Sequence, residues 1–498
     1  MSNSKTRREF LITAGTGVAV GLLSPSLSPL LAQAGPALRV RKNVMSTAAQ
    51  RDLASLKKGV DEMKKLFKAN QNDPRGWVKQ AFLHGNCTRF TYCQHGNWYF
   101  PPWHRSYIYY FEQLIQFFSG DSSFALPYWD WSRTISVPGS FYGAGNPLDD
   151  DISLKTPPPP IPTICSNAPT AGRGVAQGTQ ITPSELDTYC GPRRINIIQS
   201  DPDYATYGGS EFGAGMLEST PHNFIHRWVG GAASGSRKIS NMVQTFSPMD
   251  PIFWLHHCNI DRLYSNWLAR GYQPPTDPAW TGKSFDDFYD KDKNKVGKEF
   301  TAGMTVDSKV MGYVYDTLLA MPKALTVEKR GTGKAEVEGS VSASKSTAKA
   351  GVLSFVTEAA PSTQTRQFLN AAAVGTADQV VRLIIHGVKK PKKQSTGVHV
   401  FIGPHITAHT PITAPGYVGS FTFFQSAFDD SEHHHERTVL FNATEALRSL
   451  YGDTNLPEGV PLQVSIVTGP LGPGVESFAT VEEVRPDRIQ IEVVNLNA

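Results

Sequence analysis

Three stretches of this chain combine a broad apolar surface with histidine, and this combination limits the folds that the chain can adopt. They are residues 104–119, 222–229 and 250–269, all rich in large apolar side chains. Apolar residues over so wide a face predict buried helices in the middle of a bundle. A further helical pattern covers residues 48–70, after a short strand-like run at 38–43. The first part of the chain is therefore expected to be mainly α-helical.

The pattern changes in the second part of the chain. Residues 327–351 are small and polar, which indicates a linker. Beyond them, short alternating runs separated by turn residues predict an antiparallel β-sandwich. These runs cover residues 379–388, 398–402, 420–424, 438–441, 463–467 and 488–494. We therefore expect a mainly α domain over residues 35–326, with a long loop at 135–215, and a β-sandwich domain over residues 352–498.

Composition excludes several classes of protein. Hydrophobic residues make up 40% of the chain and charged residues 18%, which argues against a disordered or coiled-coil protein. The 48 Lys and Arg residues are balanced by 44 Asp and Glu residues. No nucleic-acid-binding face is therefore indicated. The sequence does not indicate an oligomeric state.

The amino terminus has the features of an export signal. Arg7 and Arg8 precede an uncharged run from Phe10 to Ala34, and the run ends in small residues at the positions that a signal peptidase requires. Paired arginines before a modest apolar segment are typical of the twin-arginine route, which carries folded proteins. We expect residues 1–34 to be removed, leaving no stable membrane span, and the protein to reach the bacterial periplasm or to be secreted. A retained amino-terminal membrane anchor is the alternative.

The histidines of the helical part fall into two clusters that are far apart in sequence. The first contains His84, His95 and His104, and the second contains His222, His226, His256 and His257. His222 and His226 are four residues apart on a predicted helix, so their rings face the same side and can share one metal ion. Three imidazoles per cluster suit copper or zinc, and two clusters suit a pair of ions.

Neighbouring residues favour copper over zinc or iron. A zinc-protease motif requires Glu directly after the first histidine of the pair, but this position holds Asn223. A di-iron site requires repeated Glu-x-x-His motifs, and Glu218 has no counterpart. Asp261 lies one turn after His257, where its carboxylate is expected to orient that imidazole. A site of imidazoles without carboxylate ligands favours two copper ions.

Two long motifs resemble the copper signatures of the tyrosinase and polyphenol oxidase family. The first runs from His95 through Phe-Pro-Pro-Trp-His104 to Glu112, and the second is Asp250-Pro-Ile-Phe-Trp-Leu-His-His257-Cys-Asn-Ile-Asp-Arg262. The likeness covers residues 38–320 and ends at Tyr313-Val-Tyr315, similar to the paired tyrosines that close the family's catalytic domain. The amino-terminal signal and the carboxy-terminal extension are most similar to bacterial polyphenol oxidases.

The resemblance implies a four-helix bundle that holds a dicopper site, followed by a domain that shields the site and keeps the enzyme latent. Its substrates would be small phenols and O2, and a copper chaperone would be its partner in metal loading. The ligands of the first copper would be His84, His95 and His104, and those of the second His222, His226 and His257. His256, the first of the adjacent pair, would lie behind the ligands.

The resemblance also assigns residues to the reaction. Glu218 and Asn223 would hold a water molecule that deprotonates an incoming phenol, whose pKa near 10 otherwise keeps it neutral. Their presence favours hydroxylation of monophenols in addition to oxidation of o-diphenols to o-quinones. Arg227 would flank the entrance and favour carboxylated phenols. The alternatives are a catechol oxidase without monophenolase activity and an oxygen carrier like molluscan haemocyanin.

The five cysteines are too few for a disulfide framework. Cys93-Gln94-His95 resembles the Cys-x-His thioether of fungal tyrosinases and molluscan haemocyanins. Cys87 lies near the position of the crosslinking cysteine in plant enzymes, so either Cys87 or Cys93 could be linked to His95. Cys165 and Cys190 lie in one loop-rich segment and could form a disulfide. His433-His434-His435 is expected to be a solvated loop, with transient metal binding as the alternative.

Overall fold

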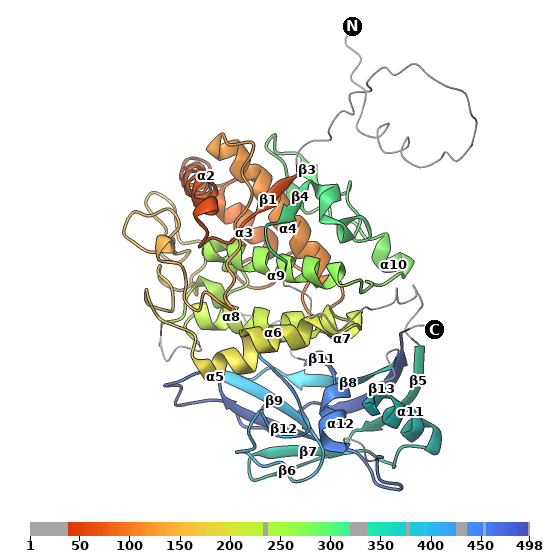
Figure 1. The fold of residues 1–498 in the computed structure, drawn as a ribbon. Coiled ribbons are helices and arrows are strands. Elements are labelled where there is room, and N and C mark those ends of the chain that lie inside the picture. Colours follow the sequence, from red (N-terminus) through yellow and green to blue (C-terminus); the bar gives the residue numbers. More distant parts are fainter. Residues whose placement is uncertain are drawn as a thin grey trace, which may run out of the picture. The chain divides into compact units, whose positions relative to one another are not determined.

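The structure is a computed structural model (Figure 1). It describes residues 38–232, 238–318, 336–374, 379–393, 395–424, 436–451 and 455–496. The expected signal at 1–34, the first part of the expected linker and the histidine triplet at 433–435 lie outside the described residues. Among the helices that the structure describes, none has the length and apolar character needed to cross a membrane.

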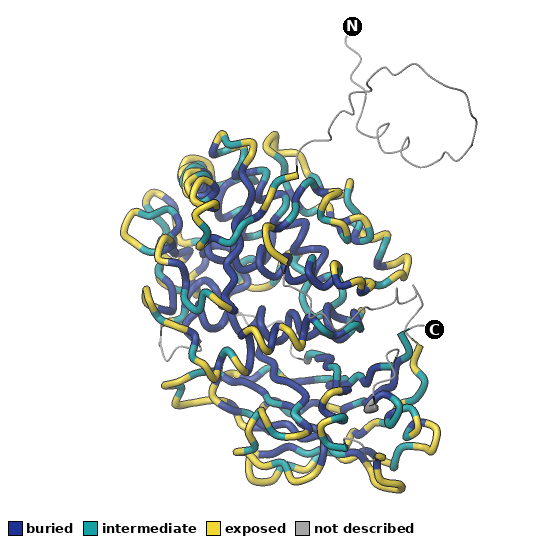
Figure 2. The backbone as a smooth tube through the Cα atoms, viewed as in Figure 1, coloured by how far each residue is buried: buried dark blue, intermediate teal, exposed yellow. Residues whose placement is uncertain are grey.

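Helices build the first part of the structure, as the sequence predicts. The central ones are α2 (Gln50–Ala69), α3 (Trp77–His84), α4 (Phe100–Ser119), α8 (Asn223–Val229) and α9 (Ile252–Ala269). The sequence prediction missed α3. Helix α4 begins at Phe100 rather than His104 because Pro101 and Pro102 occupy its first turn, where a missing N–H loses no hydrogen bond. Many residues of these helices are buried, and their stretches of backbone are dark blue in Figure 2.

A short parallel pair of strands joins the two ends of the helical part. Strand β1 (Arg39–Arg41) pairs with β4 (Tyr313–Tyr315). Arg41 is fully buried, donates to Glu112 at 2.9 Å and to Asp261 at 3.1 Å, and lies 3.6 Å from the ring centroid of Tyr313. Because these partners come from the middle and the ends of the domain, the network holds α4 and α9 to both termini of the helical part. Smaller elements are β2 (Phe288–Tyr289), β3 (Lys295–Val296) and α10 (Pro278–Thr281).

Part of the segment expected to be a long loop is helical. Within residues 135–215 lie α5 (Pro183–Glu185), a π-helical turn (Leu186–Cys190), α6 (Pro192–Gln199) and α7 (Tyr204–Tyr207). The high Pro and Gly content misled the prediction, because Pro183 and Pro192 stand in first helical turns. The Cys165–Cys190 disulfide, which the sequence left open, does not form: Cys165 bonds Cys87, and Cys190 is a free, buried thiol.

The Cys87–Cys165 disulfide joins the segment after α3 to the insertion, across 78 residues of sequence. Replacing both cysteines with serine is expected to lower the free energy of unfolding by about 4 kcal/mol, because the bond restricts a loop of that length in the unfolded chain. Unfolding in guanidinium chloride measures the change. Oxidised and reduced wild-type protein serve as a second comparison, and equal midpoints in both comparisons would contradict the prediction.

Two antiparallel sheets form the second part, so the predicted sandwich is confirmed. Their strand orders are β10-β9-β12-β7-β6 and β11-β8-β13-β5. The strands are β5 (Glu336–Ala343), β6 (Ser346–Lys349), β7 (Val352–Val356), β8 (Gln379–Lys389), β9 (Thr396–Ile402), β10 (Tyr417–Phe421), β11 (Glu436–Asn442), β12 (Gln463–Pro470) and β13 (Arg488–Asn495). Alternate residues of β8 (Val381, Leu383 and Ile385) are fully buried, as a strand in a face-to-face sheet packing requires.

The second half of the expected linker is part of this sandwich. Residues 336–349 form β5 and β6, which lie at the edges of the two sheets. Edge strands tolerate small and polar residues because one side of them is exposed, and this composition gave the wrong linker prediction. Two helices that the sequence did not indicate, α11 (Thr363–Val374) and α12 (Thr444–Tyr451), accompany the sheets.

The sandwich and the helical part are joined by polar contacts and main-chain pairing. Ala214 of the helical part pairs with Val439 of β11. Arg382 of β8 forms an ion pair with the buried Asp203 at 2.6 Å. Asn442 donates to Asp201 at 2.8 Å. At the end of β10, Thr220 donates to the Ser420 carbonyl at 2.8 Å and the Thr422 N–H donates to the Ser219 carbonyl at 3.0 Å, which holds this end against the helical part.

Candidate metal centre

All seven histidines of the two sequence clusters converge in the interior of the helical part. His84 ends α3, His104 lies in the first turn of α4, and His226 lies on α8. His95 lies on the loop between α3 and α4, and α9 carries both His256 and His257. His222 ends a π-helical turn, Glu218–His222, in which Pro221 lacks the N–H that a regular α-helix would use.

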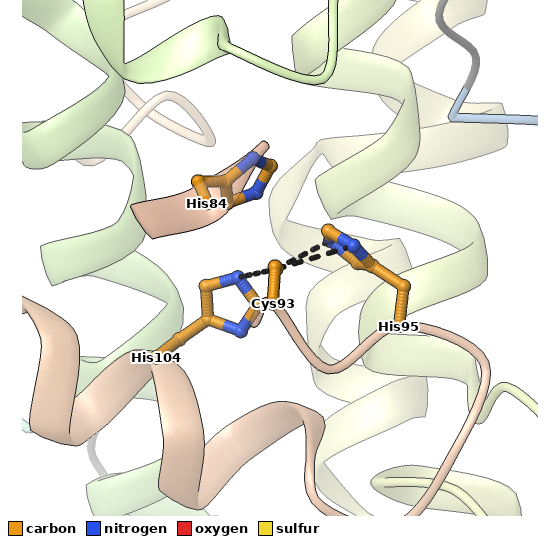
Figure 3. A group of neighbouring side chains, drawn as sticks. All are labelled: His84, Cys93, His95 and His104. Atoms are coloured by element: carbon orange, nitrogen blue, oxygen red, sulfur yellow. Dashed lines mark hydrogen bonds between the residues drawn. The ribbon is translucent and has the colours of Figure 1, made fainter. Parts of the chain in front are cut away.

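The first group consists of His84, Cys93, His95 and His104 (Figure 3). One potential ligand atom from each of these residues lies within 4.8 Å of the others. The Sγ atom of Cys93 lies 3.2 Å from Nε2 of His104. It also lies 3.3 Å from Nδ1 and 3.7 Å from Nε2 of His95, and is therefore close to both nitrogens of that ring.

The second group consists of His222, His226, His256 and His257. Its potential ligand atoms also lie within 4.8 Å of one another, and all four residues are fully buried. Nε2 of His226 is 3.2 Å from Nε2 of His257. Two nitrogens bound at about 2.0 Å to one tetrahedral metal ion would lie about 3.3 Å apart. This spacing therefore fits two imidazoles that share one ion.

The imidazole rings of the two groups pack directly against one another. The ring centroids of His104 and His257 are 4.4 Å apart and the rings are nearly parallel, at 13°. The centroids of His95 and His222 are 5.4 Å apart. Rings of one group therefore pack directly on rings of the other, as a site for two neighbouring ions requires.

Hydrogen bonds at the outer ring nitrogens orient most of these imidazoles. The Nδ1 atoms of His84, His104 and His226 lie 2.5, 2.8 and 2.8 Å from the main-chain carbonyl oxygens of Thr245, Phe100 and Met242. A carbonyl only accepts, so each Nδ1 carries the proton and each Nε2 keeps a lone pair for a metal ion. His84 Nε2 and His222 Nε2 are buried without a hydrogen-bond partner among the described residues.

Burial keeps these imidazoles neutral, which is the form that binds metal. It lowers the pKa of His84 and His226 to about 3. It also lowers the pKa of the other histidines of the two groups well below the usual value. Neutral imidazoles whose lone pairs converge without carboxylates suit copper.

His256 differs from the other three histidines of the second group. Its Nδ1 atom accepts a hydrogen bond from the indole N–H of Trp131 at 3.1 Å. An indole nitrogen only donates, so the proton of neutral His256 is on Nε2. Neither nitrogen then has a lone pair for a metal ion, so His222, His226 and His257 are the histidines of the second group that can offer one.

Asp261 does not orient His257, contrary to the sequence prediction. Its carboxylate accepts hydrogen bonds from Arg41, Arg105, Tyr313 and Tyr315. The Arg105 and Arg41 guanidiniums hold the pKa of Asp261 below its usual value, against the opposing effect of burial. Asp261 does lie one turn after His257, but its carboxylate is part of the buried hydrogen-bond network that joins the two ends of the helical part.

Glu218 is a buried carboxylate beside the first group. Both of its oxygens accept from the main-chain N–H of Gly96, at 2.9 and 3.0 Å. Gly96 has φ +69°, so the turn directly after His95 depends on glycine. Burial raises the pKa of Glu218 to about 7, while the charge of Arg437 and the Gly96 N–H oppose the rise. A carboxylate with such a pKa suits a general base near neutral pH.

Asn223 and Arg227 both contact the β-sandwich. Asn223 accepts from Nδ1 of His222 at 2.9 Å through Oδ1, and its Nδ2 donates to the Thr422 carbonyl at 2.9 Å. Arg227 donates to the Phe423 carbonyl at 2.7 Å and is buried. Burial lowers the pKa of Arg227 to about 9. Arg227 thus lies beneath the sandwich in this structure rather than at an open entrance.

The segment that these residues hold, residues 420–424, is called the cover segment below. It consists of the last two residues of β10 and the three that follow, and it brings the fully buried ring of Phe424 onto both histidine groups. The Phe424 ring centroid is 4.2 Å from that of His226 and 5.1 Å from that of His95. The sequence analysis placed residues 420–424 in a strand and gave no sign of this contact. A run of aromatic residues, Phe-Thr-Phe-Phe, was the only signal, and a sandwich core explains such a run equally well.

Comparisons with known proteins agree with this geometry. The protein-family model described as the common central domain of tyrosinase matches residues 74–270. The tyrosinase HcTyr1 of Hahella sp. (strain CCB-MM4) is 28% identical over 345 residues, which are 62% of this chain and 69% of that protein. The chloroplastic polyphenol oxidase A1 of Vicia faba is 29% identical over 297 residues, covering 56% of this chain and 48% of that protein. The matches thus span about two thirds of the bacterial relative and about half of the plant one.

Solved structures share the fold of both parts of the chain. A latent aurone synthase (polyphenol oxidase) matches with a TM-score of 0.65 at 20% identity, over 93% of this chain and 91% of that one. A latent apple tyrosinase matches with a TM-score of 0.59 at 20% identity, over 93% and 97%. The family's site is a pair of copper ions, which fits the two histidine groups. The chain therefore contains the common central domain of tyrosinase at residues 74–270 and shares the fold of latent polyphenol oxidases.

Proposed function

We propose that this protein oxidises small phenols with O2 at a pair of copper ions. His84, His95 and His104 would hold the first ion, and His222, His226 and His257 the second. The observation that carries the proposal is the set of buried Nε2 lone pairs on His84, His104, His222 and His226, each fixed by a hydrogen-bond partner at Nδ1 of the same ring. When bound, the copper pair supplies O2 activation and electron transfer.

Metal analysis and turnover test this proposal together. The full-length chain should bind two copper ions, and with the cover removed it should convert 4-methylcatechol to a coloured quinone. An oxygen carrier would bind copper and O2 without turnover. A haemocyanin unit from octopus shares the fold with a TM-score of 0.52, at 18% identity. Absence of turnover in a chain that carries two copper ions would contradict the proposal.

Among the chain's own residues, Glu218 is proposed to remove the proton of an incoming monophenol, either directly or through a water molecule held with Asn223. The carboxylate lies next to the first group, and burial gives it a pKa of about 7. The base form then exists near neutral pH, whereas a free phenol has a pKa near 10. An o-diphenol depends less on such a base because it offers two adjacent oxygens. The proposed activity therefore includes monophenol hydroxylation, and catechol oxidation alone is the second candidate.

Replacing Glu218 with Gln is expected to lower tyramine hydroxylation by about 100-fold and to change 4-methylcatechol oxidation by less than about threefold. Gln keeps an oxygen that accepts from Gly96, so the turn after His95 is preserved. In the wild type, hydroxylation should fall as the pH falls through the pKa of Glu218, because protonation removes the base. Steady-state rates with both substrates measure the split. Equal losses on both substrates would mean that Glu218 only positions His95.

Two further roles are proposed for residues near the site. Arg227 is a buried cation beside His226, and without the cover segment it would attract carboxylated phenols.

Cys93 would form a thioether with His95, because its sulfur is close to both nitrogens of the His95 ring and so to the carbon between them. This bond forms with loss of two electrons and two protons, which O2 accepts. Cys87 is engaged in a disulfide and is not available for this link.

The sandwich is proposed to shield the site, so that the full-length chain is latent. Thr220, Asn223 and Arg227 donate to carbonyl groups of the cover segment at 2.7 to 2.9 Å, and Phe424 fills the space over the histidines.

Export through the twin-arginine route is proposed on the basis of the paired arginines, and the Cys87–Cys165 disulfide favours an oxidising compartment. A copper chaperone remains the proposed partner in metal loading.

A further inference from the structure

A cavity of about 860 Å³ lies between the helical part and the sandwich, away from the histidines. One wall is formed by α6 and the residues directly after it, and the other by the start of β10 and by α12. None of the described residues that line it belongs to the two histidine groups or to the cover segment. Pockets that hold small organic molecules have volumes of about 300 to 1,000 Å³. The cavity therefore has the size of a ligand site that is separate from the metal centre.

Arg194 is a buried cation without a counterion at this cavity. It lies in the first turn of α6, lines the cavity and is 6% exposed. Its Nε atom is buried without an acceptor, and its guanidinium forms no ion pair or hydrogen bond with any residue that the structure describes. The ring centroid of Tyr417 lies 5.1 Å from its guanidinium carbon. An arginine remains charged at neutral pH, and a buried charge without a partner costs free energy that an anionic ligand would offset.

Arg193 adds a second positive charge to the same cavity. Its side chain is exposed and, among the described residues, has no ion pair or hydrogen bond. Both arginines lie in the first turn of α6, which contains no acidic residue. The amino-terminal end of a helix carries a positive partial charge, so these arginines add to the local positive potential instead of offsetting it. Anions bind at helix ends of this kind.

The acidic residues that line the cavity do not compensate these two charges. Glu445 forms an ion pair with Arg448 one turn further along α12. Asp201 accepts a hydrogen bond from Asn442 at 2.8 Å. Burial and the nearby Asp203 raise the pKa of Asp201 to about 7, so it is partly neutral near neutral pH. The cavity thus retains an excess of positive charge.

We infer that this cavity binds a small molecule that carries a phosphate group, with Arg194 and Arg193 as the residues that recognise the phosphate. Two positive charges without counterions match the two negative charges of a phosphate monoester. The planar guanidinium of Arg194 offers parallel donors to two phosphate oxygens. The cavity is many times larger than a phosphate group, and Ile197 and Tyr272 line part of the remaining space. The organic part of a monoester therefore finds apolar contacts there.

The ligand would contact both parts of the chain. Arg193 and Arg194 belong to the helical part, whereas Arg448 belongs to the sandwich and lines the opposite wall. The ion pair of Arg448 with Glu445 is partly exposed and therefore weak, so the Arg448 guanidinium is able to turn toward a bound phosphate. A ligand that binds across this interface stabilises the folded chain in proportion to its occupancy.

Calorimetric titration of the metal-free, full-length chain tests the inference, in a buffer without other oxyanions. Phenyl phosphate should bind with one molecule per chain, and at least about fivefold more tightly than inorganic phosphate, because its ring adds apolar contact area. Equal affinities would identify free phosphate as the ligand. Benzoate, which has one charge, should bind at least about tenfold more weakly than phenyl phosphate.

Arg194→Met is the decisive variant, because methionine fills similar space without a charge. It should weaken phenyl phosphate binding by at least about 20-fold. Without phosphate it should unfold at the same temperature as the wild type or at a higher one, because an unpaired buried charge is removed. Arg193→Gln and Arg448→Gln should each weaken binding by about threefold. Arg133→Gln is the matched control, since it removes the same charge from an exposed residue outside the cavity, and its affinity should be unchanged.

Unfolding temperatures give a second measurement. Phenyl phosphate should raise the unfolding temperature of the wild type and leave that of Arg194→Met unchanged. Unweakened binding in Arg194→Met, no binding of either phosphate by the folded wild type at millimolar concentration, or benzoate binding as tight as that of phenyl phosphate would overturn the inference. All of these measurements use the chain without copper, so their outcome is independent of whether the copper-loaded chain oxidises phenols.

Discussion

Replacing His257 with Gln is expected to remove the second copper ion and to lower phenol oxidation by more than about 1,000-fold. The same replacement at the adjacent His256 should leave two copper ions in the protein and reduce activity by no more than about tenfold. Loss of a residue that merely orients a ligand already costs about 10- to 100-fold, and loss of the ligand itself costs more. The two variants differ by one position on the same helix and are equally buried.

The reason for the difference is the proton on each ring. Trp131 donates to Nδ1 of His256, which places the proton of that ring on Nε2 and removes it from the ligand set. Nε2 of His257 faces Nε2 of His226 at 3.2 Å, and the ring is held between Phe253 and His104, with centroid distances of 4.1 and 4.4 Å. His257 is therefore oriented by stacking, and its Nε2 is directed into the site.

Copper content and activity, measured on both variants under the same loading conditions, decide the matter. Trp131→Phe provides a further check, because it frees Nδ1 of His256 and allows that ring to change its tautomer. This variant should keep two copper ions, since His257 still occupies the ligand position. A His256→Gln protein with one copper ion, together with a His257→Gln protein with two, would reverse the assignment.

The sequence was sufficient to predict which histidines come together, because the motifs that carry them are local. His222 and His226 face the same side of one helix, and both copper signatures are continuous in the chain. The residues that orient the ligands could not be predicted in this way. The acceptors at His84 and His226 are the carbonyls of Thr245 and Met242, and any residue type offers a carbonyl. Asp261 has the carboxylate that was expected to accept a hydrogen bond from a ligand imidazole, but this carboxylate accepts from Arg41 and Arg105 instead.

Features that depend on long-range pairing were also beyond the sequence. Five cysteines allow several pairings, and Cys165 meets Cys87 only because the insertion folds back on the segment after α3. Composition was misleading where a strand lies at a sheet edge, as in residues 336–349. The role of Phe424 depends on where β10 ends relative to α8, and no local pattern encodes that position.

Replacing Phe424 with Ala is expected to raise kcat/KM of the full-length chain for 4-methylcatechol by at least about 10-fold. The phenyl ring of Phe424 lies on His226 and His95. Its removal leaves a space of one aromatic ring over both histidine groups, which is the shape of the substrate. Each factor of ten in kcat/KM corresponds to about 1.4 kcal/mol, which is the free energy that displacing the Phe424 ring no longer costs.

Phe423→Ala is the matched control for this experiment. Phe423 is 2% exposed and packs on Phe421, so its truncation also removes a buried aromatic ring, at a cost of about 3–5 kcal/mol in stability. Its ring has no contact with the histidines among the ring pairs of the described residues. The carbonyl that accepts from Arg227 is retained in this variant. General loosening of the sandwich would raise activity in both variants, whereas a specific cover would raise it in Phe424→Ala alone.

The two variants separate shielding from mere attachment of the sandwich. If Phe424 covers the site, the gain in Phe424→Ala should appear mainly in KM, because the substrate no longer competes with the ring for the same space. The bound copper should keep its absorption spectrum, since no ligand changes. Equal gains in both variants would indicate that the cover acts through the whole segment. No gain in Phe424→Ala, in a protein that carries two copper ions, would show that phenols reach the site by another path and that the sandwich does not make the enzyme latent.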